Sequence, residues 1–155
     1  MRRALPAAAA VLALMRAAGA QDLQAGEERG LRWTCGGVGA EERAWLARRR
    51  AEANLELLFV TEKRGGYLAD AAVAVQRTGA GGEAVRFVAD GPQCLLSVPP
   101  GRYRIEATLG ERKRALEATA GMPGAGHPRL VFAFPGDPWD GIWASDEEKR
   151  QAREP

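Results

Sequence analysis

Apolar and polar residues alternate in short runs between residues 55 and 134, and glycine- and proline-rich turns separate the runs. This pattern is typical of short β-strands that bury one face. It predicts seven strands whose inward residues are Leu55, Leu57 and Phe59; Ala71, Val73 and Val75; Val85 and Phe87; Cys94, Leu96 and Val98; Tyr103, Ile105, Ala107 and Leu109; Leu116 and Ala118; and Leu130, Phe132 and Phe134. Seven strands with one apolar face each predict a seven-stranded antiparallel β-sandwich in a mainly β protein.

A proline-rich corner, PPGRY at residues 99–103, lies between two of these runs. Pro100 fixes φ near −65° and Gly101 tolerates positive φ, as the two central positions of a type II turn require. We therefore expect Pro99, Pro100 and Gly101 to reverse the chain and to set the register of the following strand. A slip of one residue there would turn Tyr103 to solvent.

One helix is predicted before the sandwich, over residues 40–54. The segment 40–53 has no glycine or proline and is rich in strong helix formers. Acidic residues at its start and arginines toward its end suit the helix dipole. The helix is expected to pack on the sandwich by a stripe of alanines flanked by Trp45 and Leu46, and its three successive arginines are expected to face solvent; these residues are Ala40, Ala44, Ala47 and Ala51, and Arg48, Arg49 and Arg50.

The first twenty residues have the three parts of a cleavable secretion signal: a charged start, an apolar run over 4–15, and a small-x-small ending at Ala18 and Ala20. The apolar run is shorter than the roughly 20 residues that a membrane-spanning helix needs. The leader predicts an exported protein with no stable membrane insertion after cleavage. Abundant arginine, alanine and glycine favour a bacterial source and hence the periplasm.

Removal of this leader changes the charge of the chain. The precursor carries a formal net charge of +2 at pH 7, and the leader contains three arginines and no acidic residue, which leaves −1 for residues 21–155. A nucleic-acid-binding domain normally keeps a basic surplus to contact phosphates. We therefore expect no binding to nucleic acid.

Cys35 and Cys94 are the two cysteines of the chain. An even number of cysteines in an exported protein favours a disulfide, and the alternative is two small buried apolar residues. With the single His127 they supply too few ligands for a zinc site. We expect no metal and no cofactor.

Residues 89–107, ADGPQCLLSVPPGRYRIEA, resemble the carboxypeptidase regulatory-like domain, which is a transthyretin-like β-sandwich. Asp90-Gly91 matches the Asp-Gly turn of the family, and residues 99–103 match its Pro-Pro-Gly-x-Tyr motif. Residues 65–75, GGYLADAAVAV, are similar to an earlier turn and strand of the family. The likeness covers about residues 55–134, and it implies an accessory or binding domain without catalytic residues.

Two segments flank the sandwich domain, which we place at residues 55–135. Residues 21–39 are glycine-rich and polar, and they predict a flexible N-terminal segment anchored by Trp33 and Cys35. Residues 136–155 form a C-terminal tail with Trp139 and Trp143 in an otherwise polar run. The tryptophans either dock onto the sandwich or form an exposed platform for a ligand.

Catalytic chemistry is not expected. His127 lies in a loop, and no serine or cysteine stands in a recognisable nucleophile motif, so we predict that the chain is not an enzyme. The aspartates at turns lack the alternating ligand pattern of a calcium loop; these are Asp70, Asp90, Asp137 and Asp140.

Two functions therefore remain. The favoured one is a non-catalytic exported β-sandwich that binds or scaffolds another envelope protein, with an exposed edge strand as a docking place. The alternative is a small carbohydrate- or peptidoglycan-binding module that stacks sugars on Trp139, Trp143 or Trp33.

Overall fold

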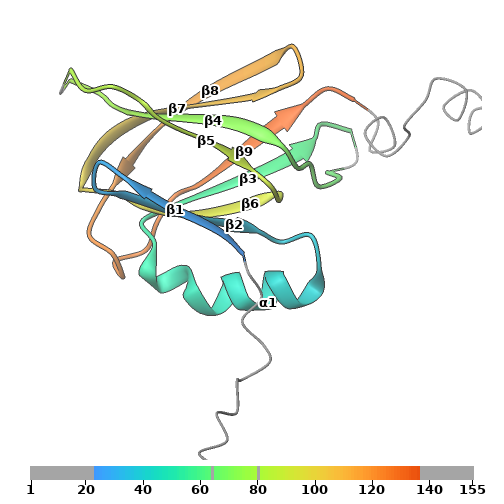
Figure 1. Ribbon diagram of the computed structural model, residues 1–155, viewed down its shortest axis with the longest axis horizontal. Coiled ribbons are helices and arrows are strands. Elements are labelled where there is room, and N and C mark those ends of the chain that lie inside the picture. The colour runs from blue at the N-terminus through green and yellow to red at the C-terminus, as the bar shows by residue number, and fades with distance from the viewer. Residues whose placement is uncertain (1–22, 64, 80, 137–155) are drawn as a thin grey trace, which may run out of the picture.

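The computed structural model describes residues 23–63, 65–79 and 81–136. They form a mainly β fold, as the sequence predicts, with nine strands rather than seven (Figure 1). In chain order the elements are β1 (Gln24–Glu28), β2 (Leu31–Gly36), α1 (Ala40–Arg49), the 3₁₀ helix η1 (Arg50–Glu52), β3 (Leu55–Thr61), β4 (Ala71–Arg77), β5 (Val85–Ala89), β6 (Gln93–Ser97), β7 (Gly101–Leu109), β8 (Arg112–Ala120) and β9 (Arg129–Phe134).

The strands form two sheets, of order β1-β2-β6-β3-β9 and β5-β4-β7-β8. The sheets lie one above the other, and α1 lies on the outer side of the five-stranded sheet (Figure 1). Every pair is antiparallel except β3 and β9, which run parallel, so the prediction of an entirely antiparallel arrangement is wrong at this edge. After β8 a loop returns the chain to the end of the five-stranded sheet where β3 begins. There the Glu56 N–H group donates a hydrogen bond to Pro128 O at 3.1 Å.

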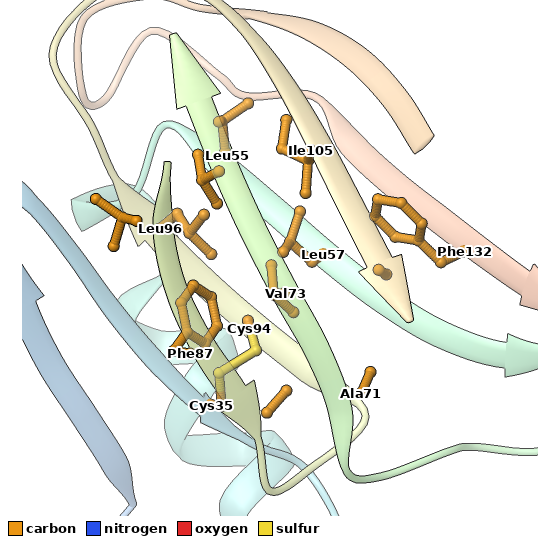
Figure 2. Close-up of a cluster of buried hydrophobic side chains, with 14 of the residues drawn as sticks. Cys35, Leu55, Leu57, Ala71, Val73, Phe87, Cys94, Leu96, Ile105 and Phe132 are labelled. Atoms are coloured by element: carbon orange, nitrogen blue, oxygen red, sulfur yellow. A yellow bond between two sulfur atoms is a disulfide. The ribbon is translucent and has the colours of Figure 1, made fainter. Parts of the chain in front are cut away.

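The core lies between the two sheets and contains the predicted inward side chains (Figure 2). Leu57 and Phe132 of the five-stranded sheet face Val73 and Ile105 of the four-stranded sheet, and all four are almost completely buried. Alternation thus predicted the buried face of each strand because residues i and i+2 share a face. The exceptions are partly buried residues of β7, β8 and β9, namely Leu109, Leu116, Ala118 and Leu130.

The predicted flexible segment 21–39 instead contains the two strands that the sequence reading missed. β1 and β2 form a hairpin whose turn residues Arg29 and Gly30 have φ of 52° and 77°. Positive φ at both turn residues suits a tight hairpin. Leu31, Trp33 and Cys35 alternate inward on β2, where Leu31 and Cys35 are buried. The hairpin is therefore part of the folded domain.

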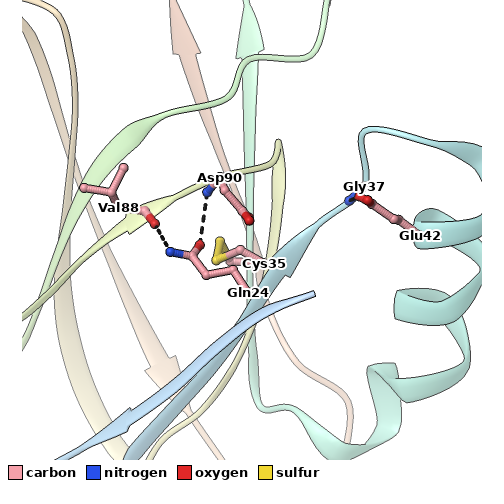
Figure 3. Close-up of a disulfide and its surroundings, with 7 residues drawn as sticks. Gln24, Cys35, Gly37, Glu42, Val88 and Asp90 are labelled. Carbon is pink, nitrogen blue, oxygen red and sulfur yellow. Dashed lines mark hydrogen bonds between the residues drawn. A yellow bond between two sulfur atoms is a disulfide. The ribbon is translucent and has the colours of Figure 1, made fainter. Parts of the chain in front are cut away.

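Cys35 and Cys94 form the predicted disulfide, which joins directly paired residues of β2 and β6. Next to it, the amide of Gln24 on β1 bridges to the other sheet: Nε2 donates to Val88 O at 2.6 Å, and Oε1 accepts from Asp90 N at 3.1 Å (Figure 3). Two effects raise the pKa of the Asp90 carboxyl group. The larger is its partial burial, and the smaller is the negative charge of Glu42 and Asp70 nearby. Covalent and polar links thus hold β1 and β2 against the strands beside them.

The PPGRY corner carries the chain from β6 in one sheet to β7 in the other. Gly101 has a φ of 155° and begins β7, far from the roughly +80° that a type II turn requires at this position, so the predicted turn type is wrong. The corner is held by Tyr103, whose hydroxyl donates to Pro99 O at 2.6 Å. A tyrosine that bonds back to the chain a few residues upstream is a recurring corner device in β-sandwiches.

Candidate functional site

The helix packs on the five-stranded sheet by a different face from the predicted one. Leu46 is fully buried and meets Ala53 and Leu95, with Leu23 and Trp45 packed around them. The predicted alanine stripe is exposed, because the larger Leu46 and Trp45 bury more apolar surface when they face the sheet. The helix therefore covers the β2 and β6 half of this sheet face.

On the β3 and β9 half of the same face, the described part of the chain leaves apolar side chains exposed or half-buried. Outward positions on these paired strands are Leu58 and Val60 on β3 and Val131 and Ala133 on β9. Tyr67 joins them through an antiparallel bridge to Val60. Tyr67 is 60 % exposed and Val131 is 47 % exposed. We call these five residues the β3–β9 patch.

A shallow hollow with two arginines lies between the patch and the helix. It has a volume of about 70 Å³, and Leu58 and Tyr67 line it together with Arg43, Gln93 and Arg129. None of the described residues that line it is acidic. Arg43 is held by hydrogen bonds from Nη1 to Gly37 O at 3.2 Å and to Val38 O at 3.1 Å. The patch thus has a positively charged border on its helix side.

The other outer sheet face is different, because charged pairs cross it. On the four-stranded sheet Arg104 lies 3.5 Å from Glu106, Lys113 lies 4.0 Å from Glu106, and Arg102 lies 4.0 Å from Glu117. Such surface pairs favour contact with water over burial against a partner. The β3–β9 patch is therefore the better docking surface of the two.

Glu56 forms a buried polar centre at the boundary between the helix and the patch. Its side chain is fully buried on β3. Oε1 accepts from Gln93 Nε2 and Arg129 Nη2, both at 2.8 Å. Oε2 accepts from Arg50 Nη2 at 2.8 Å and from Arg50 Nε at 3.1 Å, and it lies 3.2 Å from His127 Nε2. The carboxylate therefore ties η1, β6, β9 and the loop before β9 to one point.

Burial of Glu56 alone would raise the pKa of its carboxyl group. Hydrogen bonds from Arg129 and His127 and the positive charges of Arg129 and Arg50 outweigh this effect, and the pKa of Glu56 is lowered. The charged form is therefore favoured in the fold. Because each oxygen already has its partners, the cluster serves as a structural anchor, which positions Arg129 beside the patch.

We expect Glu56→Gln to lower the free energy of unfolding by about 2 kcal/mol at neutral pH, since the amide cannot accept all these bonds. The loss stays moderate because the Arg50 and Arg129 side chains are 44 % and 43 % exposed and can turn to water. A lowered pKa in the fold means that this stability is present at neutral pH and is lost as pH falls through the pKa of Glu56.

Urea unfolding of both proteins at several pH values checks this, and the difference between them should shrink in acid. Glu117→Gln is the matched control, because Glu117 is exposed on β8. Equal losses from the two variants, or a difference that grows in acid, would contradict the role given to Glu56.

A second hollow, of about 230 Å³, lies between α1 and strands β2 and β6. Trp45 lines it, and the Arg49 guanidinium lies 4.4 Å from the centre of the Trp45 ring. Arg32, Glu52, Thr34 and Ser97 also line this hollow. An aromatic ring beside several hydrogen-bonding groups is a suitable surface for a polar ligand such as a sugar.

The tryptophans predicted to stack a ligand, Trp139 and Trp143, lie outside the described residues, as do Asp137 and Asp140. Trp33 stacks on Phe87 with ring centroids 4.7 Å apart, so this ring packs between the sheets. His127, which lies in the loop before β9, is mostly buried against Glu56, with a side chain that is 10 % exposed.

The sequence reading also missed Glu56. The signal was present, since a single acidic residue stands between leucines in the run LELLFV at 55–60. Of the predicted arginine triplet, Arg48 and Arg49 are exposed, and Arg50 turns to Glu56. Among residues 23–63, 65–79 and 81–136, no three His, Cys, Asp or Glu side chains gather in a group that could hold a metal ion.

Comparison of the chain with protein-family models, curated protein sequences and solved structures finds no match. No helix in the part of the chain that the structure describes is long and apolar enough to cross a membrane. The disulfide fits an exported protein.

Proposed function

We propose that this protein is a non-catalytic binding module of the bacterial envelope, exported to the periplasm, which docks another envelope protein on the β3–β9 patch. The observation that carries the proposal is the half-covered sheet face: α1 covers β2 and β6, whereas among the described residues nothing comparable covers the β3–β9 patch, where Tyr67 and Val131 are exposed and the other three side chains are half-buried. Contiguous exposed apolar surface with a polar border is typical of interaction sites.

Sequence and fold support the rest of the proposal. The leader at 1–20 and the disulfide support export. Two packed sheets and the Tyr103 corner in the PPGRY motif support a transthyretin-like sandwich of the carboxypeptidase regulatory-like type. Domains of that type generally serve as accessory or binding modules.

The sequence predicts an exposed edge strand as a docking place, and β9 is a candidate for it. β9 is the outermost strand of its sheet, and it carries Val131 and Ala133 of the patch. Arg114 Nε donates to Ala133 O at 3.2 Å, so one carbonyl of this edge is already bonded. We therefore expect recognition to involve the outward face of β9 more than its main chain.

The partner interaction can be tested with Val131→Asp in the exported, tagged protein, isolated from cells after chemical cross-linking. Val88→Asp is the matched control, since Val88 is 51 % exposed on β5 in the other sheet. We expect a reproducible partner whose recovery falls about tenfold with Val131→Asp, equivalent to about 1.4 kcal/mol, and which Val88→Asp retains. A partner that Val131→Asp retains, or that both variants lose equally, would overturn the docking surface.

A small carbohydrate- or peptidoglycan-binding module is the second candidate, and the 230 Å³ hollow beside Trp45 favours it. In that case a saturable change in tryptophan fluorescence is expected on titration with glycan fragments, and Trp45→Ala should abolish it. The protein partner would then be absent from the cross-linking experiment, which separates the two functions.

A further inference from the structure

The chain continues from the strand that forms the patch. β9 ends at Phe134, Gly136 is the last described residue, and nineteen residues follow, 137–155. An extended chain advances about 3.3 Å per residue. Trp139 is three residues beyond Gly136, and Ala133 is three residues before it. A chain that turned back near Gly136 could therefore bring Trp139 and Trp143 over Ala133 and Val131 without a linker.

The chemistry of this tail complements the patch and its border. It has apolar side chains at Trp139, Ile142 and Trp143, which could cover exposed apolar surface. Its charged residues are six acidic and three basic, so its formal net charge is −3; they are Asp137, Asp140, Asp146, Glu147, Glu148, Glu154, Lys149, Arg150 and Arg153. Arg43 and Arg129 line the hollow beside Leu58 and Tyr67. Arg43 bonds to main-chain carbonyls and offers the opposite charge, whereas the charge of Arg129 is shared with Glu56.

The outer face of the four-stranded sheet also has a groove, with a volume of about 270 Å³. Its floor includes Ala72 and Ala74, and Arg86, Glu106 and Lys113 stand around it. Glu106 lies in its wall, and the ion pairs across this face would lose water if a tail covered them. This groove also lies on the sheet that does not contain β9. Both facts favour the β3–β9 patch over this groove as the surface that the C-terminal tail covers.

From these observations we infer that the C-terminal tail, residues 137–155, is an intramolecular occupant of the β3–β9 patch, with Trp139 and Trp143 against Val131 and Ala133 and its acidic residues toward Arg43 and Arg129. The tail then regulates the docking surface, because a partner protein must displace it. This regulatory role rests on the proposed function, whereas occupancy of the patch can be measured on the purified protein alone.

Occupancy predicts a specific response in tryptophan fluorescence of the purified exported protein. Val131→Asp should release the tail, shift the emission to longer wavelength and increase quenching by acrylamide. Val88→Asp, on the opposite sheet, should leave both unchanged. In a background with Trp139→Phe and Trp143→Phe, Val131→Asp should have no effect, because Trp33 and Trp45 remain in their packed positions.

Amide NMR signals give an independent readout. Trp139→Ala with Trp143→Ala should shift the signals of Leu58, Val60 and Val131, and it should leave those of Ile105 in the core unchanged. Unchanged signals on β3 and β9, or shifts confined to Ala72 and Ala74, would overturn the inference. Signals that depend on protein concentration would assign the patch to a second copy of the chain and would overturn it as well.

Tail docking and partner binding are tested by separate measurements. If the tail does not dock, the fluorescence and NMR of the purified protein show it, whether or not a partner exists. If the tail docks and the patch has no partner, the fluorescence and NMR changes are observed. Cross-linking then recovers the same proteins with Val131→Asp as with the wild type. If the tail docks and the patch also binds a partner, the variant with Trp139→Ala and Trp143→Ala should recover several times more partner than the wild type.

Discussion

Replacing Cys35 and Cys94 with alanine is expected to lower the free energy of unfolding by about 3 to 4 kcal/mol. The bridge spans 59 residues of sequence, and a cross-link across a loop of this size removes much of the conformational entropy of the unfolded chain. It also fixes the β1 and β2 hairpin to β6, which lies at the centre of the five-stranded sheet. Both cysteines are fully buried, so some packing is lost as well.

Chemical denaturation of the oxidised protein, the reduced protein and the double alanine variant measures this effect. The last two should have similar stability, and both should lie well below the oxidised protein. If reduction left the midpoint of unfolding unchanged, the disulfide would not hold the hairpin as described.

Asn54→Ala is expected to cost about 3 kcal/mol, because Asn54 is a buried clamp between three chain segments. Its Nδ2 donates to Val98 O at 2.7 Å and to Gly121 O at 2.9 Å, and its Oδ1 accepts from Val98 N at 2.9 Å. Val98 is 4 % exposed, so its main-chain groups would lose their partners without gaining water. Each such orphaned group costs about 1 to 3 kcal/mol.

The matched control is Gln76→Ala, which removes an exposed amide whose Nε2 donates to Gly82 O at 3.1 Å. Its expected cost is within about 0.5 kcal/mol, as for most surface substitutions. Thermal or urea unfolding compares the two variants directly. Similar losses would mean that Asn54 does not clamp the corner between β6 and β7.

Strands with strict alternation could be predicted from sequence because each buries one face. In β7, Tyr103, Ile105 and Ala107 are buried, whereas Arg102 and Arg104 are exposed, as the pattern indicated. β1 could not be predicted in this way, since its residues QAGEE are mostly exposed and contain a glycine. The ring of Trp33 packs close to the Cα of Gly26 in this strand, which explains why a small residue stands there.

The features that make the candidate site depend on tertiary arrangement. The helix was predicted within a few residues, and its buried face was not, because Leu46 and Trp45 compete with an alanine stripe that sequence periodicity favours equally. The buried face of α1 and the anchor at Glu56 together determine that α1 covers the β2 and β6 half of the sheet. The β3–β9 patch exists only because of this placement, so strand patterns alone could not identify it.

Parallel pairing of β9 with β3 also has a functional consequence. It places Val131 beside Leu58 and Ala133 beside Val60, which brings four outward apolar side chains together. It also places Arg129 beside Glu56, where the guanidinium is held at the border of the patch. One non-local strand pairing therefore creates the apolar surface and places an arginine at its border.

Photo-cross-linking can show whether the β3–β9 patch is the contact surface of this protein. A benzophenone-bearing amino acid would replace Val131 in the exported protein, and the same amino acid would replace Val88 in a control. We expect adducts at position 131, either to the peptide 137–155 or to a partner protein, and none at position 88. No adduct at position 131, or equal adducts at both positions, would show that the β3–β9 patch is not the contact surface.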